Sequence, residues 1–344
     1  MPSPSTTSPR SAEGDLVYAD DRGLFCPSGP LYVDPWKPVD LALITHAHAD
    51  HARPGSGRYL TAEANAELLA RRVHEGAVIE SLPFGEKRRI GDAWVSFHPA
   101  GHVLGSAQVR IESGGAVWVV SGDYKRAADP TCRPFEVVPC DGFITEATFA
   151  LPVYRWPDPR AEARRILDWW NECRAQERAA VLFCYALGKS QRVLAELRRL
   201  TDRPVYVHGA MISLTEVYRQ QGIEMLETVP VMETPRGTSF RGELVMAPPS
   251  ARGSTWMRRF GRASTGFVSG WMRLRGTRRQ RSVDRGFVIS DHADWPNLLR
   301  TLEETGARRV LTTHGYTDVL ARFLREARGL DAEPLAARYE GESE

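Results

Sequence analysis

Seven residues near the start of this 344-residue sequence limit what the chain can form more than any other stretch. They read Thr-His-Ala-His-Ala-Asp-His from Thr45 to His51 and follow the apolar run Leu41–Ile44, which is typical of a buried strand. The next residues, Ala52–Gly55, include a proline and a glycine and do not favour a continued strand. The pattern predicts a turn at a strand end, where three imidazoles and one carboxylate converge.

Imidazole nitrogens and carboxylate oxygens are ligands that Zn²⁺ and Mn²⁺ accept. Four such residues this close in sequence do not easily all face one ion, so the spacing suggests two adjacent ions. A chance histidine cluster on a surface loop is the alternative. A zinc finger is excluded, because none of the five cysteines forms a Cys-x-x-Cys pair to accompany His46 and His51.

Further strands along the chain are expected to end in a histidine or an acid. These strand-end residues are His102, Asp123, Glu146, His292 and His314. Side chains beyond strand ends are where sheet enzymes usually build their sites, so we expect these to meet the cluster at Thr45–His51. Asp34 ends an earlier expected strand and precedes Pro35. We predict that it orients a ligating imidazole, with a plain turn residue as the alternative.

The middle of the chain has a different character. We expect a helix over Thr61–Val73, capped by Thr61, in the first part. Prolines then mark a linker after residue 151, and strands alternate with helices up to about residue 284, which suggests a parallel βαβ block. The pattern of strand-end histidines resumes after it. We therefore predict that residues 151–284 are an insertion in a domain formed by residues 15–150 and 285–335.

Composition adds only broad limits. Hydrophobic residues make up 42% of the sequence, but no apolar run approaches the ~18 residues of a membrane helix. Cysteines without a pairing motif predict reduced thiols, and residues 1–14 lack the apolar core of a secretory signal. We expect those residues to be a disordered leader and the protein to be cytoplasmic.

These motifs carry a family resemblance. His-x-His-x-Asp-His after a hydrophobic strand resembles the signature of the metallo-β-lactamase fold. A strand ending in Glu146, then a βαβ block, then Ser290–Asp294 (Ser-Asp-His-Ala-Asp) and Thr313–Gly315 (Thr-His-Gly) resemble the β-CASP branch. The resemblance extends from Leu16 to about Leu330. It implies an α/β fold: an αββα sandwich with an inserted β-CASP α/β domain.

Three phrases are similar to a narrower group, the bacterial exonucleases associated with an ATP-dependent DNA ligase and a helicase. They are Pro99–Ser106, Ser269–Met272 and Arg285–Trp295. Chains of this kind are also described as mRNA 3′-end processing factor-like. The resemblance therefore implies nucleic acid as the substrate, DNA ahead of RNA, and a DNA ligase and a helicase as partners.

The resemblance also implies a ligand set around two divalent ions, Zn or Mn, with a bridging hydroxide. One ion would be held by His46, His48 and His102. The other would be held by Asp50, His51 and His314, and Asp123 would bridge the two. The catalytic residues implied are Asp50, Asp123, Glu146 and His292. His292 would touch the scissile phosphate or protonate the leaving oxygen, with Glu146 orienting its imidazole.

An arginine-rich segment just before His292 is predicted to line a groove for the polymer, although a solvated face is the alternative. The residues expected to bind substrate there are Arg273, Arg275, Arg278, Arg279 and Arg281, with Trp271 stacking on a base. Ser190 could take a phosphate at a helix N-terminus. Leu187–Ser190 resembles the end of a P-loop, but Phe183 stands where glycine is required, so we expect no nucleotide cofactor.

The sequence therefore predicts a metal-dependent nuclease, foremost a DNA exonuclease acting in repair. An RNA-processing exo- or endoribonuclease is the alternative, because DNA-specific eukaryotic members of the family tend not to carry histidine at the position of His314. A hydrolase of small substrates ranks third, since it has no use for the arginines. A non-catalytic nucleic-acid-binding scaffold is the hypothesis from another class, and it is disfavoured because every ligand position is filled.

Overall fold

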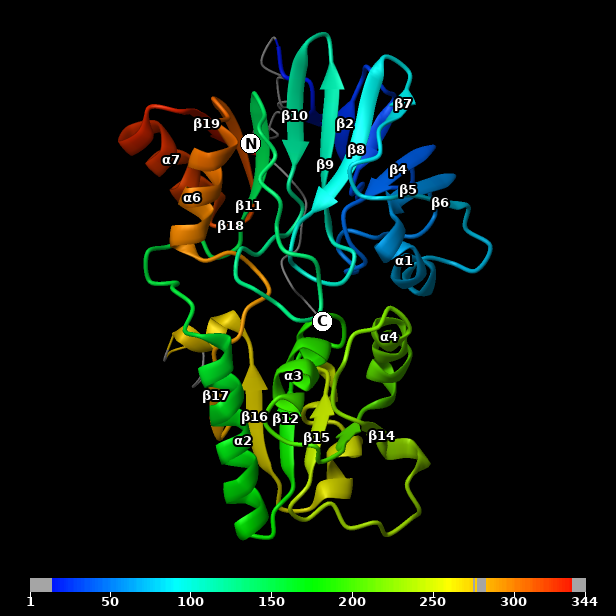
Figure 1. Cartoon of the computed structure of the whole chain (residues 1–344), viewed down its shortest axis with the longest axis vertical. Coiled ribbons are helices and arrows are strands. Elements are labelled where there is room, and N and C mark those ends of the chain that lie inside the picture. The colour runs from blue at the N-terminus through cyan, green and yellow to red at the C-terminus, as the bar shows by residue number, and fades with distance from the viewer. Residues whose placement is uncertain (1–13, 275, 277–282, 336–344) are drawn as a thin grey trace, which may run out of the picture.

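A computed structural model describes residues 14–274, 276 and 283–335. Its strands form three sheets, two of them packed together and the third set apart (Figure 1). The first sheet has the spatial order β1-β2-β3-β4-β5-β6. Its strands are β1 (Tyr18–Ala19), β2 (Leu24–Cys26), β3 (Leu31–Val33), β4 (Leu41–Ile44), β5 (Arg58–Ala62) and β6 (Ile79–Leu82).

The second sheet has the spatial order β19-β18-β11-β10-β9-β8-β7. Its strands are β7 (Arg88–Ile90), β8 (Ala93–Pro99), β9 (Ala107–Ser113), β10 (Ala116–Val120), β11 (Gly142–Ala147), β18 (Arg309–Gly315) and β19 (Asp331–Pro334). Strands β9 and β10 form an antiparallel hairpin. Strand β18 pairs in parallel with β11, so two segments more than 160 residues apart in the sequence end side by side.

Alternation along the strands explains why these two sheets pack face to face. Leu41 and Leu43 of β4 point into a core shared with the second sheet, whereas Ala42 and Ile44 point to the opposite face and α1 (Ala66–Arg72). Helices α6 (Trp295–Thr305) and α7 (Thr317–Arg328) cover the outer face of the second sheet. The result is a four-layer αββα arrangement, which confirms the predicted fold class. We call this part the sandwich.

The third sheet has the spatial order β14-β13-β15-β12-β16-β17, and all its described pairings are parallel. Its strands are β12 (Ala180–Phe183), β13 (Val205–Val207), β14 (Thr228–Pro230), β15 (Leu244–Ala247), β16 (Ser264–Val268) and β17 (Arg285–Phe287). Three helices pack on one face: α2 (Pro159–Ala175), α3 (Lys189–Arg198) and α4 (Gly209–Gln220). We call this sheet and its helices the third-sheet unit.

Short 3₁₀ helices complete the described chain. They are η1 (Glu63–Asn65), η2 (Val231–Glu233), η3 (Pro249–Ala251), η4 (Thr255–Phe260) and η5 (Gly270–Arg273). Apolar residues from the sandwich join the core of the third-sheet unit: Ala47 and Leu104 belong to the same buried cluster as Leu187 and Leu194. The loop that carries the histidines therefore lies at the junction of the two parts. Within the described ranges, no helix has the length and apolar character needed to span a bilayer.

Two elements differ from the sequence-based expectation. The helix expected over Thr61–Val73 begins later, because Thr61 pairs with Ile44 and Ser81 in the first sheet and its hydroxyl donates to the Ile44 carbonyl. Strand β17 falls in the range 285–335 that is expected to belong to the first domain, but it pairs with β16 in the third sheet. The domain limits given above remain a prediction, with β17 lying on the side of the third-sheet unit.

Candidate metal centre

The loop after β4 is anchored by Asp34. This buried carboxylate accepts hydrogen bonds from the Thr45 backbone N–H (2.8 Å) and the Thr45 hydroxyl (2.6 Å). It also accepts from Nδ1 of His51 at 2.7 Å. Asp34 thus holds both ends of the histidine cluster, and its backbone adopts a left-handed conformation with φ 44° that a non-glycine residue takes only when its surroundings enforce it.

The first ligand group consists of His46, His48, His102 and Asp123, whose candidate ligand atoms all lie within 4.8 Å of one another. Nδ1 of His48 is 3.0 Å from Nε2 of His46 and 3.1 Å from Nε2 of His102. Asp123 Oδ2 lies 3.5 Å and 3.7 Å from the same two Nε2 atoms. His102 comes from the loop after β8 and Asp123 from the end of β10, so strand ends distant in sequence converge here.

The outer nitrogen of each ring decides which nitrogen faces the centre. Nε2 of His48 donates to the Leu187 carbonyl at 3.2 Å, and Nδ1 of His102 donates to the Asp291 carbonyl at 2.7 Å. His46 Nδ1 lies 3.1 Å from the Thr45 hydroxyl oxygen, which already donates to Asp34 and so accepts from the ring. In each neutral ring the proton is therefore on the outer nitrogen, and the inner nitrogen presents a lone pair.

The second ligand group consists of Asp50, His51 and His314. Because Nδ1 of His51 donates to Asp34, the neutral ring presents a lone pair on Nε2, which lies 3.4 Å from Asp123 Oδ2 and 3.7 Å from Asp50 Oδ2. The His51 and His314 rings stack with centroids 4.9 Å apart. Asp123 therefore lies between the two groups.

This donor set fits divalent cations. Three imidazole lone pairs and a carboxylate face one another at 3.0–3.7 Å, an arrangement that repels itself unless positive charge lies among them. Asp123 Oδ1 is buried and has no hydrogen-bond partner among the described residues. Burial holds the pKa values of His46 and His102 well below the usual histidine value, which favours the neutral form that binds metals.

The pKa of His51 is shifted in the opposite direction from those of His46 and His102. Burial lowers the pKa of His51, but the carboxylates of Asp123, Asp50 and Asp34 outweigh it and raise the pKa well above the usual value. The concentration of negative charge on this side is the kind that a bound cation neutralises.

Glu146 and His292 form a buried pair next to the first ligand group. Nδ1 of His292 is 2.9 Å from Glu146 Oε2, and Glu146 Oε1 accepts from the Tyr124 backbone N–H at 2.7 Å. The His292 ring centroid is 4.7 Å from that of His102. Burial raises the pKa of the Glu146 carboxyl, against the lowering effect of His292. Asp123, Glu146 and His292 also bring ligand atoms within 4.8 Å of one another.

The backbone at the end of β18 explains the Thr-His-Gly sequence. His314 adopts φ 58°, and Gly315 follows at φ 69°. A Cβ on Gly315 would lie 2.5 Å from Thr148 Cα and 2.6 Å from the Ala147 carbonyl oxygen, so only glycine fits against β11 there. The pairing register shifts between Glu146 and Ala147 at the same place, which aims His314 at the centre.

The residues predicted to bind substrate differ in how far they are exposed to solvent. Trp271 is half-buried and packs on Phe149, with ring centroids 4.7 Å apart. Arg273 is exposed, and Ser190 is fully buried with its hydroxyl donating to the Ala186 carbonyl at 2.8 Å. The remaining predicted arginines, Arg275, Arg278, Arg279 and Arg281, lie outside the described residues.

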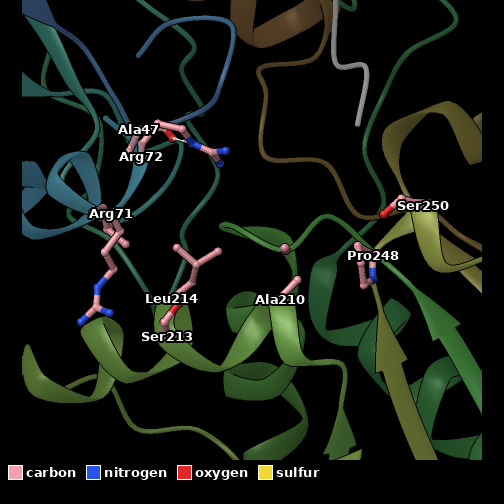
Figure 2. A pocket seen from close by; sticks show the side chains of 10 residues that line it. Ala47, Arg71, Arg72, Ala210, Ser213, Leu214, Pro248 and Ser250 are labelled. Atoms are coloured by element: carbon pink, nitrogen blue, oxygen red, sulfur yellow. Dashed lines mark hydrogen bonds between the residues drawn. The ribbon is translucent and has the colours of Figure 1, made fainter. Parts of the chain in front are cut away.

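A cavity of about 360 Å³ next to the histidine loop was not foreseen from the sequence. Figure 2 shows Arg71 and Arg72 of α1 on one side and Ser213 of α4 on the other, with Ala47 of the histidine loop at its edge. Arg72 Nε donates to the Ala47 carbonyl at 3.1 Å. From the sequence the adjacent arginines indicate only the end of a helix, because nothing in it shows that α4 lies opposite.

Comparisons with known proteins place these observations in context. No family model matches the chain. A probable DNA ligase of Opitutus terrae is 35% identical over 319 residues, covering 90% of this chain and 30% of that protein. An RNase J-like protein of Methanocaldococcus jannaschii is 25% identical over 211 residues, covering 53% of this chain and 50% of that protein. The chain thus spans half or less of the length of these relatives.

Two further matches agree with them. A ribonuclease of Thermus thermophilus is 28% identical over 217 residues, covering 53% of this chain and 49% of that protein. The crystal structure of a protein of unknown function from Enterococcus faecalis V583 superimposes with a TM-score of 0.57 at 12% identity, covering 81% of this chain and 76% of that one. At that identity the structural likeness bears on the fold alone.

Proposed function

Because the chain belongs to the β-CASP branch of the metallo-β-lactamase superfamily, we propose that it is a metal-dependent nuclease that hydrolyses phosphodiester bonds. One observation carries the proposal: two ligand groups that share Asp123 lie beside the buried Glu146–His292 pair. The residues of both groups come from strand ends spread along the chain, and every predicted ligand position carries a histidine or an aspartate.

The ligand groups would hold one or two divalent ions, Zn or Mn. Bound ions lower the pKa of water and neutralise charge that develops on a phosphate. The role of the protein is to keep the imidazole lone pairs facing inward through Asp34, Thr45 and the carbonyls of Leu187 and Asp291. These hydrogen bonds fix the rings before any ion arrives.

His292 is proposed to act on the substrate and not on an ion. Glu146 accepts the hydrogen bond from Nδ1, and its carboxylate favours the doubly protonated imidazolium form, in which Nε2 of the same ring also carries a proton. We propose that Nε2 delivers this proton to the leaving oxygen or binds the scissile phosphate. Glu146 orients the ring, and its second oxygen is held by the Tyr124 backbone.

DNA is the proposed substrate. The match to the protein named a probable DNA ligase covers nearly the whole chain, which favours a role in trimming DNA ends before ligation. From the sequence resemblance we further propose a DNA ligase and a helicase as partners, and the cytoplasm as the location. The relatives named RNase J-like protein and ribonuclease favour RNA processing as the second candidate. Arg71 and Arg72 beside the histidine loop are suited to either polymer, because guanidinium groups pair with the phosphates of both.

The test uses DNA and RNA strands of one sequence, labelled at the 5′ or the 3′ end and incubated with Mn²⁺ or Zn²⁺. We expect metal-dependent shortening of the DNA from one end, with RNA cut more slowly. Faster cutting of RNA would replace DNA by RNA in the proposal. Absence of cleavage on both polymers with both metals would refute the nuclease assignment.

A further inference from the structure

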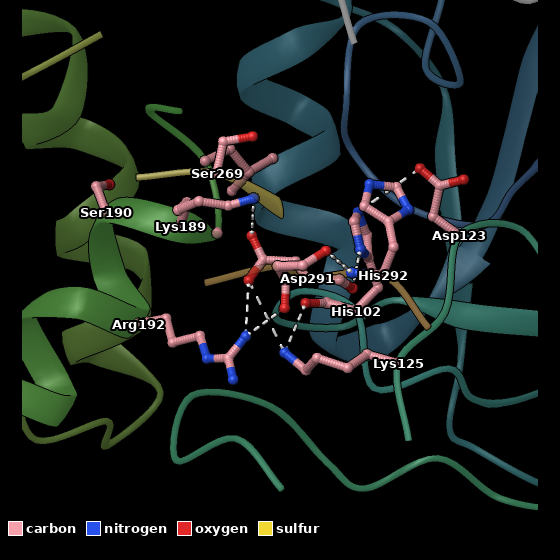
Figure 3. A network of polar contacts seen from close by, with 12 residues as sticks. His102, Asp123, Lys125, Lys189, Ser190, Arg192, Ser269, Asp291 and His292 are labelled. Atoms are coloured by element: carbon pink, nitrogen blue, oxygen red, sulfur yellow. Dashed lines mark hydrogen bonds and ion pairs between the residues drawn. The ribbon is translucent and has the colours of Figure 1, made fainter. Parts of the chain in front are cut away.

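Five charged side chains are buried together where the sandwich meets the third-sheet unit. Figure 3 labels four of them: Lys125, Lys189, Arg192 and Asp291. We call all five the buried charge cluster: Lys125, Asp129, Lys189, Arg192 and Asp291. Every one of these side chains is at most 3% exposed. The first two follow β10 in the sandwich, the next two lie on α3 of the third-sheet unit, and Asp291 lies in the segment between β17 and α6.

Asp291 is the centre of this cluster. Its Oδ2 is 3.0 Å from Lys189 Nζ, and its Oδ1 is 3.2 Å from Arg192 Nη1 and 3.9 Å from Lys125 Nζ. Arg192 also donates to the Ser290 carbonyl at 2.6 Å. One carboxylate therefore receives cations from both parts of the molecule, and the neighbouring backbone is held as well.

The charges of the cluster make Asp291 hard to replace. Three cations face two carboxylates, and the second carboxylate, Asp129, is engaged by Lys125 and by Arg192 Nε at 3.3 Å. Burial alone would raise the pKa of the Asp291 carboxyl, but Lys189, Lys125 and Arg192 hold it well below its usual value. Without Asp291, three buried cations would share one anion, and an uncompensated buried charge is strongly unfavourable.

The backbone next to this cluster supplies the outer hydrogen bonds of two metal-ligand rings. The Asp291 carbonyl accepts from His102 Nδ1, and the Leu187 carbonyl, two residues before Lys189, accepts from His48 Nε2. The outer nitrogens of His46 and His51 are instead held by Thr45 and Asp34 of the sandwich. Two rings of the first ligand group are therefore oriented by carbonyls beside the buried charge cluster, whereas His51 of the second group is oriented from within the sandwich.

Close packing at Gly188 fixes the distance between the start of α3 and the loop that carries His102. Gly188 has φ 88°, and a Cβ added to it would lie 2.3 Å from Val103 Cγ1, in the residue after His102. Any larger residue would push α3 away from the loop that carries His102. The distance between Asp291 and the cations of α3 depends on the same approach.

We propose that Asp291 is a positioning residue: its carboxylate, held by cations from both parts of the molecule, presents its own carbonyl to His102 and so sets the affinity of the first ligand group for its ion. This inference rests on the proposed metal centre. It does not depend on which polymer is cut, or on whether any is cut.

The experiment is a Co²⁺ titration of the full-length Asp291→Asn protein, followed by visible absorption and by competition with a chelator. The His102→Ala and His314→Ala variants identify which absorption band belongs to the first and which to the second ligand group. We expect Asp291→Asn to weaken Co²⁺ binding at the first group by about 10–100-fold and to change its band, because outer hydrogen-bond partners have effects of that size. Binding at the second group should stay within about 3-fold of wild type, far less than that effect.

Two controls separate positioning from general loss of stability. Asp15→Asn removes a carboxylate that Arg309 contacts at 3.1 Å through two nitrogens, at the far end of β18 from His314, and should leave Co²⁺ binding unchanged. The double variant Lys189→Met/Asp291→Asn removes a cation together with the anion. The double variant should regain thermal stability but still bind Co²⁺ weakly at the first ligand group. If the single variant does not fold, the same Co²⁺ titration is made on the double variant.

The outcomes are distinguishable. Wild-type affinity at the first group in Asp291→Asn or in the double variant would overturn the inference and leave the metal centre intact. Equal weakening of both groups, with a parallel effect of Asp15→Asn, would also overturn it, since Asp291 would then be structural only. A wild-type protein that takes up no Co²⁺ would overturn the metal centre and this inference together.

Discussion

Asp123 contacts both ligand groups. Its Oδ2 lies within 3.7 Å of one nitrogen from each of three rings, those of His46, His51 and His102. Replacement by asparagine keeps the shape of the side chain but removes its charge. We therefore expect Asp123→Asn to lose bound metal and to reduce cleavage by about 100-fold or more, given that even outer-shell changes reach that size. Metal analysis and initial rates on end-labelled DNA measure the two effects.

A surface variant serves as the control for this prediction. Asp202 has an 85% exposed side chain on the third-sheet unit, so Asp202→Asn makes the same chemical change away from the centre. It should retain metal content and rate, and far-UV circular dichroism should show both variants folded. Full cleavage by Asp123→Asn would contradict the assignment of Asp123 as the shared ligand.

His292 should respond differently from a ligand. If it acts on the substrate, His292→Ala slows turnover by about 10²–10⁴-fold, the usual range for a general acid or base, and leaves metal content near wild type. Glu146→Gln should slow turnover less than His292→Ala does. The amide oxygen can still accept one of the two hydrogen bonds that Tyr124 and His292 donate to the carboxylate. Metal content falling in step with turnover would identify His292 as a ligand instead.

The sequence indicated those site residues that are close together along the chain. It did not indicate contacts between residues that are far apart in the sequence. His46, His48 and His51 are adjacent after one strand, so their spacing alone indicated metals. Asp34 was expected near the centre, but its bonds to Thr45 were not. The proposed role of Asp291 could not be inferred from the sequence, because its three cations come from two segments distant in the sequence and its carbonyl contacts a ring 189 residues away.

At the scale of elements, the start of α1 is set by strand pairing in the first sheet and not by the local helix-capping pattern. Thr61 followed by Glu63 is a reasonable helix start, but Thr61 is held in β5 between β4 and β6. The helix begins at Ala66, and it places Arg71 and Arg72 on the cavity, where Arg71 extends toward α4 and Arg72 contacts the Ala47 carbonyl. Hydrophobic patterns predicted strands alternating with helices after residue 151, whereas the face that α1 presents to the third-sheet unit depends on packing between the two parts.

Helix α1 is expected to contact the polymer. Arg71→Ala and Arg72→Ala together should weaken binding of single-stranded DNA and lower the slope of log affinity against log salt by about 0.7 for each phosphate that is no longer neutralised. Metal content should not change, because neither side chain is a ligand. Fluorescence anisotropy at several salt concentrations, with a metal that does not support cleavage, measures both quantities.

Helix α7 offers a matched control for this pair. Arg322 forms an exposed i,i+4 ion pair with Glu326, as Arg71 does with Glu67 on α1. Arg322→Ala and Arg328→Ala together remove the same net charge and should leave affinity and salt slope near wild type, since α7 lies on the outer face of the second sheet. An equal effect of the two changes would show only a loss of net charge and would remove α1 from the proposed binding surface.

At the scale of the whole molecule, the candidate metal centre lies at the junction of the sandwich and the third-sheet unit. The candidate ligands belong to the loops of the sandwich, whereas the Leu187 carbonyl comes from the third-sheet unit and the Asp291 carbonyl from the segment between β17 and α6. Ala47 and Leu104 also pack in the apolar core of the third-sheet unit. An ion that binds the folded centre therefore stabilises both parts in their present arrangement.

Metal removal should for that reason lower the stability of the entire chain and not of one loop. An ion that binds only the folded state stabilises it by about 4 kcal/mol when its free concentration is 1,000 times the Kd. We expect chelation to lower the unfolding temperature, Zn²⁺ or Mn²⁺ to restore it, and proteolysis between the two parts to become faster in the metal-free protein. Differential scanning calorimetry of wild type and Asp123→Asn measures this. The shift should be absent from Asp123→Asn, and an equal metal-dependent shift in both proteins would mean that the stabilising ion binds elsewhere.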